Sequence, residues 1–176
     1  MTPFLPFVLA ERGIVDIDRE DWHAADAIAQ QAMSIMARGD FDDYWTSALV
    51  YAWVARVASH RGNAAEGRDH IVRAARLRPL LTYALPVVSA QALLEMARAY
   101  VALADPSGAR AALRQLQDVV QQRPDLGGLP GQAKELRARL DAVTVRAMGA
   151  SSLTTAELRV LTLLPTHFTF REIGER

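Results

Sequence analysis

The fold is decided by the stretch Tyr51-Ala-Trp-Val-Ala-Arg-Val-Ala-Ser-His-Arg-Gly-Asn-Ala-Ala-Glu-Gly67 and its continuation to Pro79. The largely apolar run that opens it is typical of a buried helix. The polar turn Arg61-Gly62-Asn63 ends that run, and a second helix is predicted over Ala65–Leu77, before Pro79. The stretch therefore predicts two antiparallel helices joined by a short turn.

Elements of this hairpin recur 42 residues before and after it. The aligned sets are Ala25, Gly67 and Ala109; Gly13, Ala55 and Ala97; Leu9, Tyr51 and Leu93; and the turns Arg19-Glu20-Asp21, Arg61-Gly62-Asn63 and Asp105-Pro106-Ser107-Gly108. Small residues let antiparallel helices approach closely, while large apolar neighbours fill the seam. The flanking units therefore predict second helices over Trp22–Arg38 and Ala109–Gln122. The predicted fold is all-α, built of antiparallel helical hairpins.

These hairpins resemble tetratricopeptide-like repeats, most clearly over residues 51–79. The positions that match the motif are Ala55, Gly62, Gly67, Ala74 and Pro79. The period of 42 departs from the usual repeat of about 34 residues, and Gly67 replaces the favoured alanine. The resemblance implies hairpins stacked as a superhelix over residues 1–148, closed by a final helix at Gln132–Met148. The alternative is an irregular helical bundle without true repeats.

The C-terminal segment 153–176 carries two capping-box patterns, which begin at Thr154 and Thr169. In each, the hydroxyl and a glutamate three residues later can satisfy two free backbone N–H groups. An apolar stripe of leucines lies between them, and Pro165 ends the first helix. Two short helices are therefore expected here, after a flexible linker at residues 149–152. On capping alone, this segment is a generic helical hairpin.

The residues of that segment also resemble the start of the LuxR-type DNA-binding helix-turn-helix domain. The matching pattern is Leu-Thr-x-x-Glu-x-x-Val-Leu-x-Leu-Leu, then Thr-x-x-Glu-Ile-small-x-Arg. Gly174 replaces the usual alanine, which weakens the second helix by about 1 kcal/mol. The resemblance implies a truncated domain, because the sequence stops before the helix that enters the major groove. The scaffold positions it implies are Thr154, Glu157, Thr169, Arg171, Glu172 and Arg176.

Charge and composition limit the function classes. The formal net charge is zero, and the charges of residues 153–176 also cancel, so we expect weak or absent DNA binding by this chain alone. There is no cysteine, and the apolar N-terminal run is too short for a signal peptide or membrane span. We therefore expect a cytoplasmic protein without membrane contact. Abundant alanine, with Lys134 as the sole lysine, is typical of a GC-rich bacterial genome.

Signals for catalysis are weak. The four histidines are far apart, without the paired spacing of a metal site, and no glycine-rich phosphate loop ends in Lys-Ser or Lys-Thr. The acidic run Asp40-Phe-Asp42-Asp43 lacks the glycine and distant glutamate of a calcium loop. No Ser/His/Asp arrangement exceeds chance. We therefore predict no enzyme activity, no metal and no cofactor.

The first helices of the middle and third hairpins are predicted to line the concave surface of the array. The residues expected there are Arg56, Ser59, His60, Leu94 and Arg98. Arginines on such a surface can meet a carboxylate or phosphate of a protein or small-molecule effector. The simpler interpretation is that they only keep the surface soluble.

Together these patterns predict a fragment of a LuxR-type transcriptional regulator similar to the MalT-like members. Its repeat array would serve effector sensing or protein–protein interaction, and DNA would be a partner of the full-length protein. In that family such arrays commonly follow an ATPase module, so Met1 and Arg176 are expected to be truncation points. The alternative is a freestanding helical-repeat scaffold that binds a protein partner and not DNA.

Overall fold

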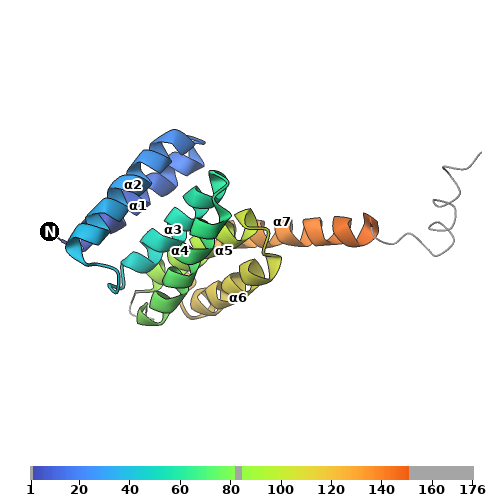
Figure 1. Ribbon diagram of the computed structural model, residues 1–176. Coiled ribbons are helices and arrows are strands. Elements are labelled where there is room, and N and C mark those ends of the chain that lie inside the picture. Colours follow the sequence, from blue (N-terminus) through green and yellow to red (C-terminus); the bar gives the residue numbers. More distant parts are fainter. Residues whose placement is uncertain (1, 82–84, 151–176) are drawn as a thin grey trace, which may run out of the picture. The chain divides into compact units, whose positions relative to one another are not determined.

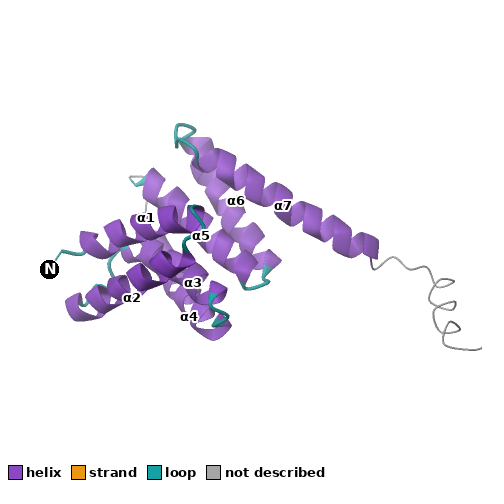
Figure 2. Ribbon diagram, turned by 90° about the horizontal axis from the view of Figure 1, so that it is seen from above, coloured by secondary structure: helices purple, strands orange, loops and turns teal. Residues whose placement is uncertain are grey.

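The computed structural model describes residues 2–81 and 85–150, and side chains only as far as residue 143. Within these residues the chain is all-α, as predicted (Figures 1 and 2). The helices are α1 (Phe4–Asp18), α2 (Trp22–Gly39), α3 (Ser47–His60), α4 (Ala64–Leu77), the 3₁₀ helix η1 (Arg78–Leu80), α5 (Pro86–Ala102), α6 (Pro106–Gln122) and α7 (Leu129–Ala150). The chain divides into two units within α7, after Arg137. The site lies in the first unit.

The first six α-helices form three hairpins. Helices α1 and α2, α3 and α4, and α5 and α6 pack against each other in pairs, and α3 also contacts α1 and α5. Because α3 has neighbours on several sides, its Tyr51 and Trp53 are fully buried. Leu93 of α5 is also fully buried, whereas Leu9 of the terminal helix α1 is only partly covered. The apolar core therefore centres on α3 and α5.

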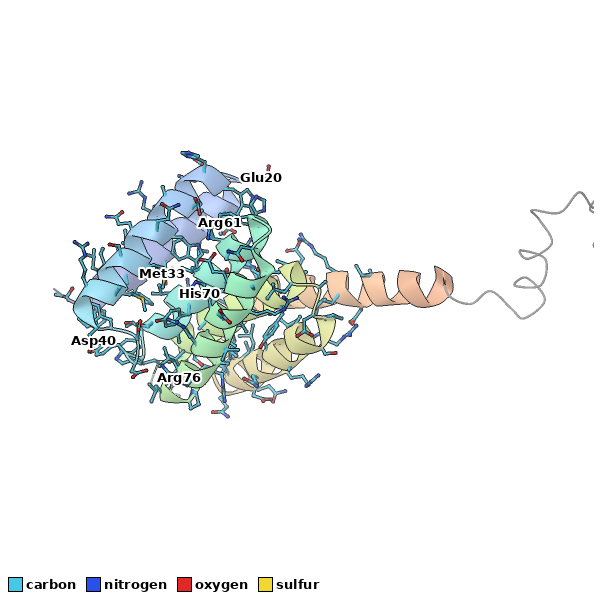
Figure 3. All side chains as sticks on the ribbon, viewed as in Figure 1. Glu20, Met33, Asp40, Arg61, His70 and Arg76 are labelled. Atoms are coloured by element: carbon cyan, nitrogen blue, oxygen red, sulfur yellow. The ribbon has the colours of Figure 1, made fainter. Side chains whose placement is uncertain are left out.

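The three hairpin turns repeat in their backbone conformation. Each contains one residue in the left-handed region, namely Glu20 at φ 64°, Gly62 at 82° and Ala104 at 56°. These residues are spaced by 42 positions, and Figure 3 labels Glu20 and the neighbouring Arg61 at the first two turns. Glycine adopts this region freely, whereas Glu20 and Ala104 adopt it against their preference. The turns therefore share one geometry at the 42-residue period, even where the residue type disfavours it.

The capping residues follow the same period. Asp21, Asn63 and Asp105 are the N-caps of α2, α4 and α6. The side chain of each accepts a hydrogen bond from the backbone N–H three residues later, of Ala24, Glu66 and Gly108 respectively. An N-cap satisfies a donor that the helix itself leaves unpaired. The second helix of each hairpin therefore begins with the same capping hydrogen bond.

The predicted helix bounds are close to those observed. Trp22–Arg38 and Ala65–Leu77 are each one residue shorter than α2 and α4. Helix α6 begins at Pro106, three residues before the prediction, because Asp105 caps it and proline is tolerated in the first turn. Helix α7 extends the prediction at both ends and includes residues 149 and 150, which were expected to belong to a linker.

Close helix contacts explain the small residues of the repeat. A Cβ built on Gly67 lies 2.6 Å from Ser59 Oγ and 3.2 Å from the Ala55 carbonyl oxygen. One built on Gly13 lies only 2.0 Å from the ring of Trp53. Ala25, at the position equivalent to Gly67 in α2, is completely buried. These positions are therefore small because another helix occupies the space beside them.

Two further predictions concern the C-terminal segment and the absence of a membrane span. The LuxR-type scaffold positions Thr154, Glu157, Thr169, Arg171, Glu172 and Arg176 lie outside the described residues, as does the predicted domain at 153–176. Among the helices that the structure describes, none is long and apolar enough to cross a membrane.

Candidate binding surface on the first helices of the hairpins

A buried carboxylate joins the first helices of the second and third hairpins. Glu95 of α5 is 1% exposed, and its Oε2 lies 3.1 Å from Arg56 Nη1 of α3. Its other oxygen, Oε1, lies 2.5 Å from Arg98 Nη1, one turn further along α5. The guanidinium side chains are 17% and 19% exposed, so both reach the surface. A buried charge is tolerated when it is paired and hydrogen-bonded, and each carboxylate oxygen of Glu95 has an arginine partner.

The network continues from Arg98 to the start of α7. Arg98 Nη2 donates a hydrogen bond to Gln132 Oε1 at 2.8 Å. Arg98 therefore uses separate nitrogens for Glu95 and for Gln132. The planar guanidinium can hold two partners in fixed directions, which a lysine cannot do. The network thus links α3, α5 and the first turns of α7.

A second carboxylate approaches the network from α1. Gln91 Nε2 of α5 donates to Glu11 Oε2 at 2.6 Å. Burial raises the pKa of Glu11, the Gln91 hydrogen bond opposes the rise, and the negative charge of Glu95 adds to it. The Gln91–Glu11 hydrogen bond thus links α1 to α5, one turn before Glu95.

An aromatic stack borders the network at Arg56. The rings of Trp22 and His60 lie 3.6 Å apart and almost parallel, at 7°. Arg56 Cζ lies 5.6 Å from the centre of the Trp22 ring. Arg56 is therefore held by a cation–π contact as well as by the Glu95 carboxylate. The indole and the carboxylate together restrict the directions that this arginine can adopt.

The structure brings together three of the five residues predicted for the concave surface. Arg56 and Arg98 share Glu95, and His60 joins them through the Trp22 stack. Ser59 instead donates to the Ala55 carbonyl in its own helix, at 2.6 Å, and lies close to Gly67. Leu94 is 1% exposed, so it belongs to the core and presents no binding surface. Its placement was wrong because neighbouring helices cover that side of α5.

Four residues of this network were not predicted, namely Glu11, Trp22, Gln91 and the buried Glu95. Glu95 stands between Leu94 and Met96 in an otherwise apolar run, which is a usable signal for a buried, paired charge. Its partner Arg56 is 39 residues away, and nothing in the local sequence indicates which arginine reaches it.

This surface offers charged and aromatic side chains to a partner. No group of His, Cys, Asp and Glu residues able to hold a metal ion occurs in the part of the chain that the structure describes. The Arg56–Glu95–Arg98 cluster carries one positive charge in excess, which the Glu11 carboxylate bonded to Gln91 balances. Partly exposed, preoriented guanidiniums suit a carboxylate or a phosphate. No protein-family model matches the chain, and neither a curated protein nor a solved structure is significantly similar to it.

Proposed function

We propose that this chain is the interaction array of a LuxR-type transcriptional regulator. The observation that carries the proposal is the threefold 42-residue hairpin, with its repeated left-handed turn and repeated N-cap. Repeat arrays act through extended surfaces that bind other molecules. The link to transcription is supported by the resemblance of residues 153–176 to the start of the LuxR-type domain.

The proposed binding surface is the cluster of Arg56, Glu95 and Arg98, with Trp22 and His60 beside it. Its two partly exposed guanidiniums can pair with the carboxylates of an acidic protein segment or with an anionic small molecule. The Trp22 and His60 rings offer a flat apolar contact next to that charge. The existing pairs with Glu95 hold the arginines in place before a partner arrives, which lowers the entropy cost of binding.

Partner binding is tested by purifying the tagged native protein from its own cells. We expect an acidic partner that is retained by wild type and lost with Arg98→Gln, because glutamine lacks the charge that pairs with the partner's carboxylates; circular dichroism shows whether this variant, which also gives up the pair with Glu95, still folds. Arg114→Gln is the matched control, since Arg114 is an exposed arginine of α6 and lies outside the cluster. Equal recovery of the partner with both variants contradicts the assignment of the surface.

The regulatory part is tested by mapping where the tagged native protein lies on the chromosome. Enrichment at discrete promoters is the expected result. The alternative function is a freestanding repeat scaffold, which the hairpin array by itself also supports. A stable protein complex without promoter enrichment favours that scaffold and contradicts the regulator.

A further inference from the structure

A buried histidine lies where α4 packs on α3. His70 of α4, labelled in Figure 3, is 8% exposed. Its ring stacks on the ring of the fully buried Tyr51 of α3, with 5.8 Å between the ring centres. The residues 42 positions before and after it are Ile28 and Ala112, and both are buried. The middle hairpin therefore has an ionisable side chain where the repeat otherwise has an apolar one.

The two ring nitrogens of His70 have different surroundings. Nε2 lies 3.5 Å from Glu66 Oε1, one turn earlier in α4. Nδ1 is buried and has no hydrogen-bond partner among the residues that the structure describes. The nearby carboxylate assigns the proton of the neutral ring to Nε2. Protonation would place a second proton on Nδ1, where a buried donor would lack an acceptor.

Two carboxylates of α4 favour the protonated form of His70. These are Glu66 and Asp69, and both raise the pKa of the histidine. The other oxygen of Glu66, Oε2, already accepts hydrogen bonds from Arg61 Nη2 at 3.0 Å and from Asn63 Nδ2 at 2.7 Å. The positive charge of Arg61 therefore offsets much of the attraction that Glu66 would exert on a second cation.

Burial and a neighbouring arginine oppose protonation. Arg73 Cζ lies 5.6 Å from the centre of the Tyr51 ring, on which His70 also stacks. The Asp42 carboxylate, from the segment before α3, accepts a hydrogen bond from the Tyr51 hydroxyl. Burial has the largest effect, and it lowers the pKa of His70 below the ordinary 6.5. The folded protein therefore favours the neutral ring.

Few apolar side chains larger than alanine hold α4 in place. Of its five buried residues, only Ile71 and Leu77 are of this kind, and the others are Gly67, His70 and Ala74. Helices α2 and α6 each bury three such side chains, namely Ile28, Ile35 and Met36, and Leu113, Leu116 and Val119. The His70 ring is therefore a large part of the packing of α4. In a repeat array, one element can open without the whole chain unfolding.

We propose that His70 is a pH-sensitive switch for α4: the neutral ring holds α4 on α3, and its protonation at mildly acidic pH releases the helix. A histidine in an open chain takes up a proton near pH 6.5. The closed form resists this proton, so the open form gains as the pH falls below 6.5, and the closed form is fully favoured above it.

The switch is tested by hydrogen exchange of the full chain between pH 5 and 7.5, corrected for the intrinsic pH dependence of exchange. The protection of α4 should fall at least about threefold below pH 6.5, relative to α2 and α6. His70→Ile, which introduces the residue found at position 28, should remove this dependence. His23→Gln is the matched control, because His23 is an exposed histidine of α2, and it should behave as wild type does.

Three results would overturn the switch. An equal loss of protection in all helices would indicate general acid unfolding, and an unchanged pH response of His70→Ile would exclude His70 as the cause. An NMR titration of the wild-type His70 ring needs no variant. Its expected midpoint lies below pH 6.5, and a midpoint at or above that pH contradicts the proposal. The raised pKa of Glu11 stabilises the fold as the pH falls, so Glu11 cannot produce the predicted loss.

Discussion

Gly13→Ala should destabilise the protein, although alanine is the better helix former. Replacing a glycine inside a helix by alanine gains about 1 kcal/mol from propensity. Against this, the new methyl group would lie 2.0 Å from the ring of Trp53, which is fully buried. Overpacking of a core costs about 1–3 kcal/mol, and a rigid ring at this distance places the cost at the upper end. The expected net loss is about 2 kcal/mol.

Urea unfolding followed by circular dichroism and tryptophan fluorescence measures this loss. For a chain of this size, about 2 kcal/mol corresponds to a fall in Tm of about 4–8 °C. Gly131→Ala is the control, because a Cβ on Gly131 of α7 has no other atom within 4 Å. That variant should be as stable as wild type or slightly more stable. A Gly13→Ala variant that is also stabilised would refute the close contact between α1 and α3.

Substitutions at three other residues test one hairpin turn and the charged network. Asn63→Ala removes the cap of α4 and should cost about 1 kcal/mol in thermal unfolding, whereas Asn63→Ser, which keeps a capping oxygen, should lose less. Glu95→Gln leaves two arginines without their counter-charge and should cost about 2–3 kcal/mol in urea, which a wild-type midpoint would contradict. Burial raises the pKa of Glu11 above 4.5 in the folded protein, so the folded state holds this proton more tightly than the unfolded state does. The free energy of unfolding should therefore fall as the pH rises above 4.5. Glu11→Gln should flatten that fall in urea titrations carried out from pH 4.5 upward, and an unchanged pH profile would exclude Glu11 as its cause.

Much of the fold could be predicted because its signals are local. A polar turn, a capping residue and a proline act within a few positions of themselves, so the hairpins and their helix bounds can be derived from neighbouring residues. The 42-residue register was predictable for the same reason, since each unit repeats the same local signals. The left-handed conformation of Glu20 and Ala104 could not be predicted, because neither residue type favours it.

The candidate surface was predicted only in part. Arg56, His60 and Arg98 could be placed on first helices from the repeat register alone. Whether a first-helix residue is exposed depends on which helices pack beside it. Neighbouring helices cover Leu94, so it lies in the core and not on the surface. The pairing of Arg56 with Glu95 depends on the packing of α3 against α5, which no local pattern specifies.

Local sequence signals therefore specify the helices and their 42-residue period, because hydrogen bonds and backbone preferences act over short separations. Which of the repeated faces are covered depends on how the hairpins pack against one another. Val8, Val50 and Ala92 occupy equivalent positions on three successive first helices, yet of these three only Val8 is exposed, since no preceding hairpin covers it among the described residues. The physical reason is that the burial of a residue depends on which neighbours pack against it as much as on its own side chain.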